Sequence, residues 1–150
     1  MDDNALSMIG LALRAGRVEA GEEPAGDACR ERRCRLLLVA GDAAGNTLRR
    51  AERFAALGQC LTLSLPCSRA ELGAALGRGS CALAAVTDLG LAQAIVTKLA
   101  RKDPERYGGT AERLRLKAER AAQRREKKPG STRRKGTAGR TVQYNRKNKK

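Results

Sequence analysis

The chain has 150 residues, enough for one domain with an appendage, and it carries 31 Lys and Arg against 16 Asp and Glu, with no histidine. Catalysis of the Ser-His-Asp or Cys-His type and any histidine-ligated metal site are therefore excluded. Because aromatic residues make up only 2% of the chain, we do not expect the base-stacking surface of an RNA-recognition motif or an oligonucleotide-binding barrel.

Helix-like and strand-like segments alternate through the first hundred residues. In chain order, we predict a helix over 4–15, a strand over 17–20, a helix over 21–33, a strand over 36–40, a helix over 47–57, a strand over 61–65, a helix over 68–77, a strand over 81–86 and a helix from 87 or 88 to 99. This alternation predicts the α/β class: a three-layer α/β/α sandwich with a four-stranded mixed sheet.

Local signals support individual elements. The apolar runs over 36–40 and 81–86 are continuous, which is typical of strands covered on both faces. Residues 61–65 alternate leucine with polar residues, which predicts one less buried face. Ser68 and Glu71 have the spacing of a capping box, so a helix is expected to begin after Ser68.

The net charge of +15 is concentrated in the last third of the chain. Residues 1–100 hold 12 basic and 11 acidic side chains, whereas residues 101–150 hold 19 and 5. We therefore predict a nearly neutral domain over 1–100 and a basic extension over 101–150, with a possible helix over 110–128 and disorder over 129–150.

The sequence predicts neither a membrane span nor a signal peptide. No apolar run approaches the ~18 residues that cross a membrane. Asp2 and Asp3 stand where a signal peptide requires positive charge. We expect a cytoplasmic location.

The cysteines are odd in number and form no CxxC pair, so neither a zinc ribbon nor a thioredoxin-like motif is supported. In a cytosolic protein such residues are usually reduced, and within apolar runs they behave as small hydrophobic residues. We predict that all five cysteines are reduced and structural: Cys29, Cys34, Cys60, Cys67 and Cys81. We also predict that the protein uses no metal and no cofactor.

No segment favours catalysis. Residues 41–47 resemble a phosphate-binding loop, but Asn46 stands where the lysine would be, so we prefer a strand-to-helix turn capped by Asp42 or Asn46. Contact with a phosphate backbone through N–H groups at the helix start is the alternative. Glu22 and Glu23 diverge by ~100° on a helix, so they are interpreted as compensating its dipole. We predict no enzyme and no small-molecule substrate, with a nucleotide-binding enzyme as the least favoured alternative.

The basic extension predicts binding to a polyanion. Nucleic acid is favoured over an anionic membrane because few bulky apolar residues accompany the charges, and over a solubilising tail because acidic residues serve that purpose better. The side chains of the extension expected to contact RNA are Arg113, Arg120, Arg124, Arg125, Lys127, Lys128, Arg133, Arg134, Lys135, Arg140, Arg146, Lys147, Lys149 and Lys150.

Five segments follow one another within residues 4–99: Leu11–Arg17, Gly21–Glu23, Leu36–Ala43 with Asn46-Thr47, Arg69–Gly73 and Ala85–Ala92. Together they resemble the ribosomal protein L-seven-Ae superfamily, most closely its bacterial YlxQ-type branch. The resemblance implies an α/β/α sandwich that binds structured RNA, in many members a kink-turn, and that associates with ribosomes or their maturation. It implies RNA, and ribosomal proteins as further candidates, as partners of a monomeric domain.

The resemblance maps the RNA-binding regions of the family onto Gly21–Asp27 and Val86–Leu89. Kink-turn readers carry Gly-x-Asn-Glu-x-x-Lys at the first region. This chain has Glu23 in place of the asparagine, Pro24 in place of the glutamate and Asp27 in place of the lysine. An ionised carboxylate only accepts hydrogen bonds, so Glu22 or Glu23 is expected to accept from an unstacked guanine or cytosine. The candidate RNA contacts of the domain are Arg14, Arg17, Gly21, Glu22, Glu23, Asp27, Arg30, Asp42, Asn46, Arg50, Val86, Thr87, Asp88 and Leu89.

Two functional hypotheses follow. The preferred one is a noncatalytic protein for structured RNA, in which the domain supplies shape and the extension supplies electrostatic affinity. In the alternative, the domain binds another protein at the ribosome and only the extension binds RNA.

Overall fold

The structure, a computed structural model, describes the backbone of residues 3–127 and the side chains of residues 4–124. Within this range the chain is α/β with a four-stranded mixed sheet and six helices, which confirms the predicted fold class. The elements are α1 (Asp3–Arg14), β1 (Val18–Ala20), α2 (Glu22–Arg30), β2 (Leu36–Val39), α3 (Gly45–Gly58), β3 (Leu61–Ser64), α4 (Arg69–Ala75), β4 (Leu83–Val86), α5 (Leu89–Lys102) and α6 (Pro104–Lys127).

The four strands are ordered β1-β4-β2-β3 across the sheet. β2 and β3 are parallel, and β4 is antiparallel to both β1 and β2. Every residue of the central strands β2 and β4 is buried, which explains their continuous apolar runs, whereas the edge strand β3 alternates. As a result β1, β2 and β3 end at the same edge of the sheet, where β4 begins. We call this the carboxyl edge.

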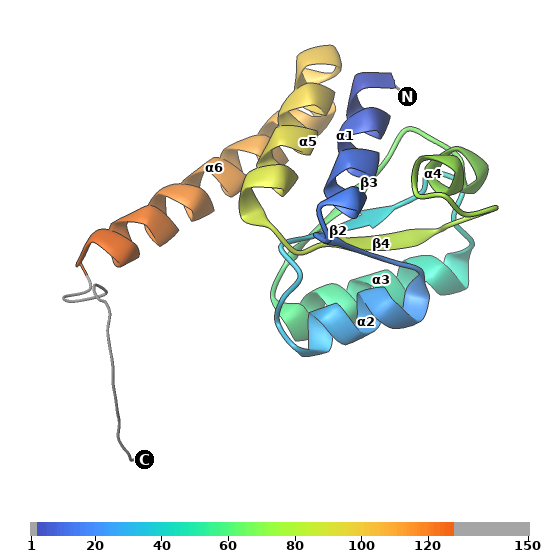
Figure 1. Cartoon of the computed structure of the whole chain (residues 1–150), viewed down its shortest axis with the longest axis horizontal. Helices are drawn as coiled ribbons and strands as arrows, with labels where there is room; N and C mark the ends of the chain where they lie inside the picture. The colour runs from blue at the N-terminus through green and yellow to red at the C-terminus, as the bar shows by residue number, and fades with distance from the viewer. Residues whose placement is uncertain (1–2, 128–150) are drawn as a thin grey trace. The chain divides into compact units, whose positions relative to one another are not determined.

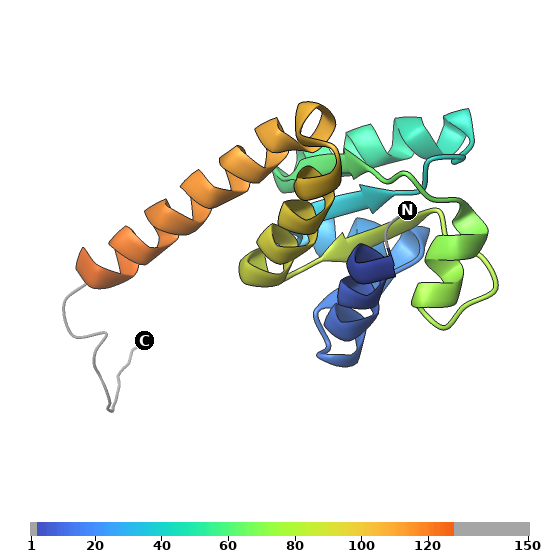
Figure 2. The ribbon, with the colours of Figure 1, turned by 90° about the horizontal axis from the view of Figure 1, so that it is seen from above.

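Helices cover both faces of the sheet (Figure 1). On one face, α1, α4 and α5 pack around Leu36 and Leu38. On the other face, α2 and α3 pack around Leu37 and Val39. Figure 2 views the sheet from the side that α1 and α5 cover. The alternating side chains of one strand thus supply two separate apolar clusters, as a three-layer sandwich requires.

Helix α6 begins at Pro104 and not at residue 110, and its first part belongs to the core. Tyr107 is 2% exposed and Leu114 is fully buried in the same cluster as the α1 side chains. The Tyr107 hydroxyl donates a hydrogen bond to the carbonyl of Ser64 at 3.0 Å. The first compact unit accordingly extends to Leu114, and a second begins at Arg115. An alanine-rich stripe alone stabilises a helix weakly, and here tertiary packing stabilises its start.

Two helix ends differ from the sequence prediction for local reasons. α2 ends at Arg30 because Arg32 adopts a left-handed φ of 59°, and the backbone N–H of Cys34 then donates to the carbonyl of Ala28 at 3.3 Å. α3 begins at Gly45, and its N-cap residue is Ala44, which offers no side-chain oxygen. The predicted cap by Asp42 or Asn46 is therefore wrong.

The caps of the two later helices are side-chain caps. The capping box is confirmed: Ser68 Oγ accepts from the Glu71 N–H at 3.0 Å, and Glu71 Oε1 accepts from the Ser68 N–H at 2.8 Å. The second of these bonds is the main reason that the pKa of Glu71 is lowered. Asp88, and not Thr87, caps α5. No helix among the described residues is long and apolar enough to cross a membrane.

Candidate functional site

Three helices begin at the carboxyl edge, because each follows one of the three strands that end there. α2 begins at Glu22, α3 at Gly45 and α4 at Arg69. First-turn N–H groups lack intrahelical acceptors and carry the positive end of the helix dipole. Ser68 caps α4, whereas α2 and α3 have no side-chain cap. These two uncapped helix starts leave backbone N–H donors for an anionic ligand at the carboxyl edge, although Glu22 and Glu23 in the first turn of α2 offset part of its helix dipole.

Gly21 sets the start of α2. Its φ of 103° and ψ of 162° lie in a region that is essentially restricted to glycine. Its N–H donates to the carbonyl of Leu83 at 2.9 Å, which fixes it beside the beginning of β4. A Cβ added at this position would lie 3.6 Å from Nη2 of Arg78. The backbone conformation therefore requires glycine, while Arg78 lies at an ordinary van der Waals distance from this position.

Arg78 is a site residue that the sequence analysis missed. It lies in the turn between α4 and β4, and its Nη1 donates to the carbonyl of Ala20 at 3.3 Å. Gly73 allows the turn to fold back, because a Cβ there would lie 2.7 Å from the Cα of Ser80. The signal was the Gly77-Arg78-Gly79 run, of which the sequence analysis used only Gly77, as the end of a helix. The exposed guanidinium therefore stands directly beside the uncapped start of α2.

The structure separates the two regions that the resemblance paired. In the β1–β4 register Val18 lies opposite Val86, whereas Gly21 lies beside Leu83, so the two regions are at opposite ends of β4. The side chain of Val86 is fully buried. The turn that adjoins Gly21 is the one that carries Arg78.

The other residues around Val86 have structural contacts. Asp88 Oδ2 accepts from the N–H of Leu91 at 2.8 Å, and Leu89 packs against the core. The N–H of Thr87 donates to the carbonyl of Arg17 at 2.8 Å. Arg14 and Arg17 are exposed beside the start of β1, and therefore also away from Gly21.

Two carboxylates near the carboxyl edge are paired with arginine. Glu22 Oε1 lies 2.8 Å from Nη1 of Arg50, a contact that joins the start of α2 to α3. Asp42 Oδ1 accepts from the backbone N–H of Arg69 at 2.8 Å and lies 3.6 Å from its Nε. These pairs reduce the repulsion that the carboxylates would exert on phosphate. They are exposed, so each adds at most about 1 kcal/mol to stability.

Glu23 differs from these carboxylates. It is exposed, and the structure shows no ion pair or hydrogen bond from it to another described residue. Asn46 is also exposed, and its side-chain oxygen accepts a hydrogen bond from Arg49. Among the described residues of this surface, Glu23 is therefore a candidate hydrogen-bond acceptor whose carboxylate is not paired with an arginine.

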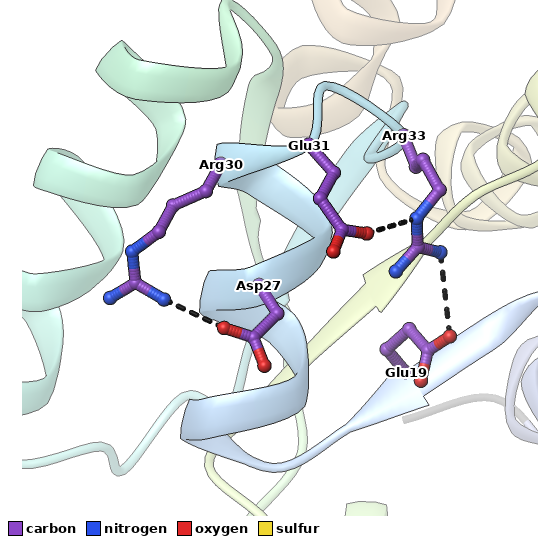
Figure 3. A network of polar contacts seen from close by, with 5 residues as sticks. All are labelled: Glu19, Asp27, Arg30, Glu31 and Arg33. Carbon is purple, nitrogen blue, oxygen red and sulfur yellow. Dashed lines mark hydrogen bonds and ion pairs between the residues drawn. The ribbon is translucent and has the colours of Figure 1, made fainter.

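Further along α2, polar contacts occupy two sides of the helix (Figure 3). Arg30 Nη1 lies 2.8 Å from Asp27 Oδ1, and its guanidinium carbon lies 5.5 Å from the centre of the Phe54 ring on α3. On the other side, Arg33 bridges Glu31 at 2.6 Å and Glu19 at 3.5 Å. Arg30 and Asp27 are thus already engaged with each other.

Of the basic residues predicted in the extension, Arg113, Arg120 and Arg124 are exposed on α6. Arg125 and Lys127 lie in the same helix, beyond the described side chains. The remaining predicted contacts lie outside the described residues: Lys128, Arg133, Arg134, Lys135, Arg140, Arg146, Lys147, Lys149 and Lys150.

Comparison with known proteins identifies a relative in sequence and a solved structure of similar fold. No family model matches the chain. It is 32% identical over 96 residues to the RNA-binding protein YlxQ of Bacillus subtilis (strain 168), covering 61% of this chain and 91% of that protein. Its fold is similar to a solved protein of unknown function from Bacillus halodurans C, with a TM-score of 0.58, 25% identity and coverage of 64% of this chain and 96% of that one. Because the alignment takes in nearly the whole of YlxQ at this identity, the chain belongs to the YlxQ family.

Proposed function

We propose that this chain is a noncatalytic protein that binds structured RNA at the carboxyl edge and through its basic extension. Ribosomal RNA is the expected target, and a cytoplasmic role at the ribosome or in its maturation, as in the ribosomal protein L-seven-Ae superfamily, is part of the proposal. The relative named as an RNA-binding protein supports it. The observation that carries it is the position of Arg78 beside the uncapped start of α2.

The chemistry of the carboxyl edge suits a nucleotide. A guanidinium presents a rigid set of donors to phosphate, and the N–H groups at a helix start add further donors. Glu23 supplies an acceptor for the amino or imino groups of an unpaired guanine or cytosine. The cation that kink-turn readers carry on the helix corresponds to Asp27 here, so Arg78 supplies positive charge from a different turn. We expect a bent or looped RNA with at least one unpaired base.

Mutation of Arg78 tests the surface. Arg78→Ala should weaken binding to a transcribed ribosomal RNA fragment about 10-fold, in line with ~1–3 kcal/mol for a specific arginine contact. Arg53→Ala is the matched control, since Arg53 is exposed on α3 away from the helix starts. Fluorescence anisotropy at fixed salt measures both variants. Equal losses for the two arginines would show that only overall charge matters.

Crosslinking separates this proposal from the alternative in which the domain binds another protein. Ultraviolet crosslinking to RNA in cells, followed by mapping of the modified peptides, should place adducts within 21–27 and 77–80. Adducts confined to residues beyond 114 would favour the adaptor hypothesis, because the domain would then touch no RNA.

A further inference from the structure

Three cysteines that are distant in the sequence meet in the structure. The sulfur atoms of Cys29, Cys34 and Cys60 all lie within 4.8 Å of one another. Cys29 is in the last turn of α2, Cys34 precedes β2 and Cys60 lies between α3 and β3. The first two are 0% and 2% exposed, and Cys60 is partly exposed. Their spacing matches no metal-binding motif, so sequence analysis interpreted each as a reduced structural residue.

The fold brings these sulfurs together through specific backbone features. The left-handed conformation of Arg32 turns the chain back, and Cys34 N–H bonds to the carbonyl of Ala28. At the end of α3, a Cβ on Gly58 would lie 3.0 Å from the carbonyl oxygen of Cys29 and 3.2 Å from its Cα, so glycine lets α3 approach α2 without a shift of a few tenths of an ångström. Cys60 follows directly after the left-handed Gln59.

The thiols face one another in an environment that opposes ionisation. Burial, and then the proximity of Cys60, raises the pKa of Cys29 to about 11. Hydrogen bonding with Cys60, and then burial, raises the pKa of Cys34. Three adjacent thiolates are unfavourable without a positive charge among them, and a metal cation supplies that charge while displacing the protons.

We propose that Cys29, Cys34 and Cys60 form a binding site for one thiophilic d10 metal ion. Among such ions, Cu(I) matches the three-sulfur donor set best. Thiolate ligands favour Cu(I) and Zn(II). With metal–sulfur bonds of about 2.3 Å, three sulfurs around one ion lie about 4 Å apart, within the observed limit. Among the described residues, no histidine, cysteine or carboxylate supplies a fourth ligand to this cluster. Three sulfurs satisfy Cu(I), whereas Zn(II) requires a water at the exposed side of Cys60.

Binding converts three thiols and one cation into a tris-thiolate complex and releases three protons. No electron is transferred, and no other reactant is required. The complex would link α2, α3 and the start of β2. It would therefore stabilise this layer of the domain, because the ion binds the folded arrangement and not the separated thiols.

The test uses the full chain, reduced and kept free of oxygen, in competition with a chromophoric Cu(I) chelator. We expect one equivalent of Cu(I) per chain and a rise in melting temperature. Cys60→Ser should lower the affinity at least about 100-fold, because even groups that only support a ligand can change metal affinity by 10–100-fold. Cys67→Ser is the matched control, since Cys67 is buried in the cluster on the opposite face of the sheet. A parallel titration with Zn(II) and a zinc chelator identifies the preferred ion.

A second measurement uses the unmutated chain, so that no variant needs to fold. Alkylation followed by mass spectrometry should show that Cu(I) protects Cys29, Cys34 and Cys60 and leaves the rates of Cys67 and Cys81 unchanged. Uptake of neither ion in the chelator competition, or protection spread equally over all five cysteines, would overturn the proposal.

Discussion

Removing residues 128–150 should abolish most of the electrostatic affinity of this protein for RNA. For the complete chain, raising the salt concentration from 50 to 200 mM should weaken binding by roughly 10³–10⁵-fold if about 6–10 phosphates are contacted. The removed segment carries nine basic and no acidic side chains. The chain ending at Lys127 should therefore show a much shallower dependence of log K on log salt, with the slope reduced by about 0.7–0.9 for every phosphate that the shortened chain no longer neutralises.

The choice of Lys127 as the last residue follows from the structure. Truncation after residue 100 would remove Tyr107 and Leu114 from the core and would confuse loss of folding with loss of charge. A second control keeps the length but replaces the nine basic residues with glutamine. Anisotropy titrations at several salt concentrations measure all three proteins. If the truncated and complete chains have the same slope, the extension does not supply the counterion-release affinity.

Leu114→Ala should lower the free energy of unfolding by about 2–5 kcal/mol, the range for removing a buried leucine. Leu114 is fully buried in the core cluster although it lies in the basic part of the sequence. Leu116→Ala is the matched control: the same substitution two residues later on α6, at a partly exposed position of the second unit. We expect this control to cost less than about 1 kcal/mol, since it leaves no fully enclosed cavity.

Urea denaturation followed by circular dichroism measures both leucine variants. A large difference would place the end of the folded domain within α6 and not at residue 100. If both substitutions were equally mild, the start of α6 would contribute little to the core, and the burial of Leu114 and Tyr107 would not matter for stability.

Local patterns in the sequence were sufficient for the fold class and for the order of the elements, although not for every helix end. The apolar run of β2 and the alternation in β3 follow from whether one or both faces of a strand are covered. The Ser68–Glu71 capping box acts within one helical turn, so it is visible in four consecutive residues. Each of these features depends on the 2.0 or 3.6 residue period of the backbone itself. Family membership was also visible, since it rests on the order of short motifs.

Long-range contacts could not be read in this way. Strand order places Arg78 beside Gly21 and moves Val86 to the other end of β4, although no local pattern encodes which strands pair. The same holds for Leu114 in the core and for Cys60 beside Cys29, which meet their partners only after the helices pack. Periodicity reports which face of an element is buried. What it is buried against depends on how the whole chain packs, and for this protein that packing assembles both the candidate RNA surface and the cysteine cluster.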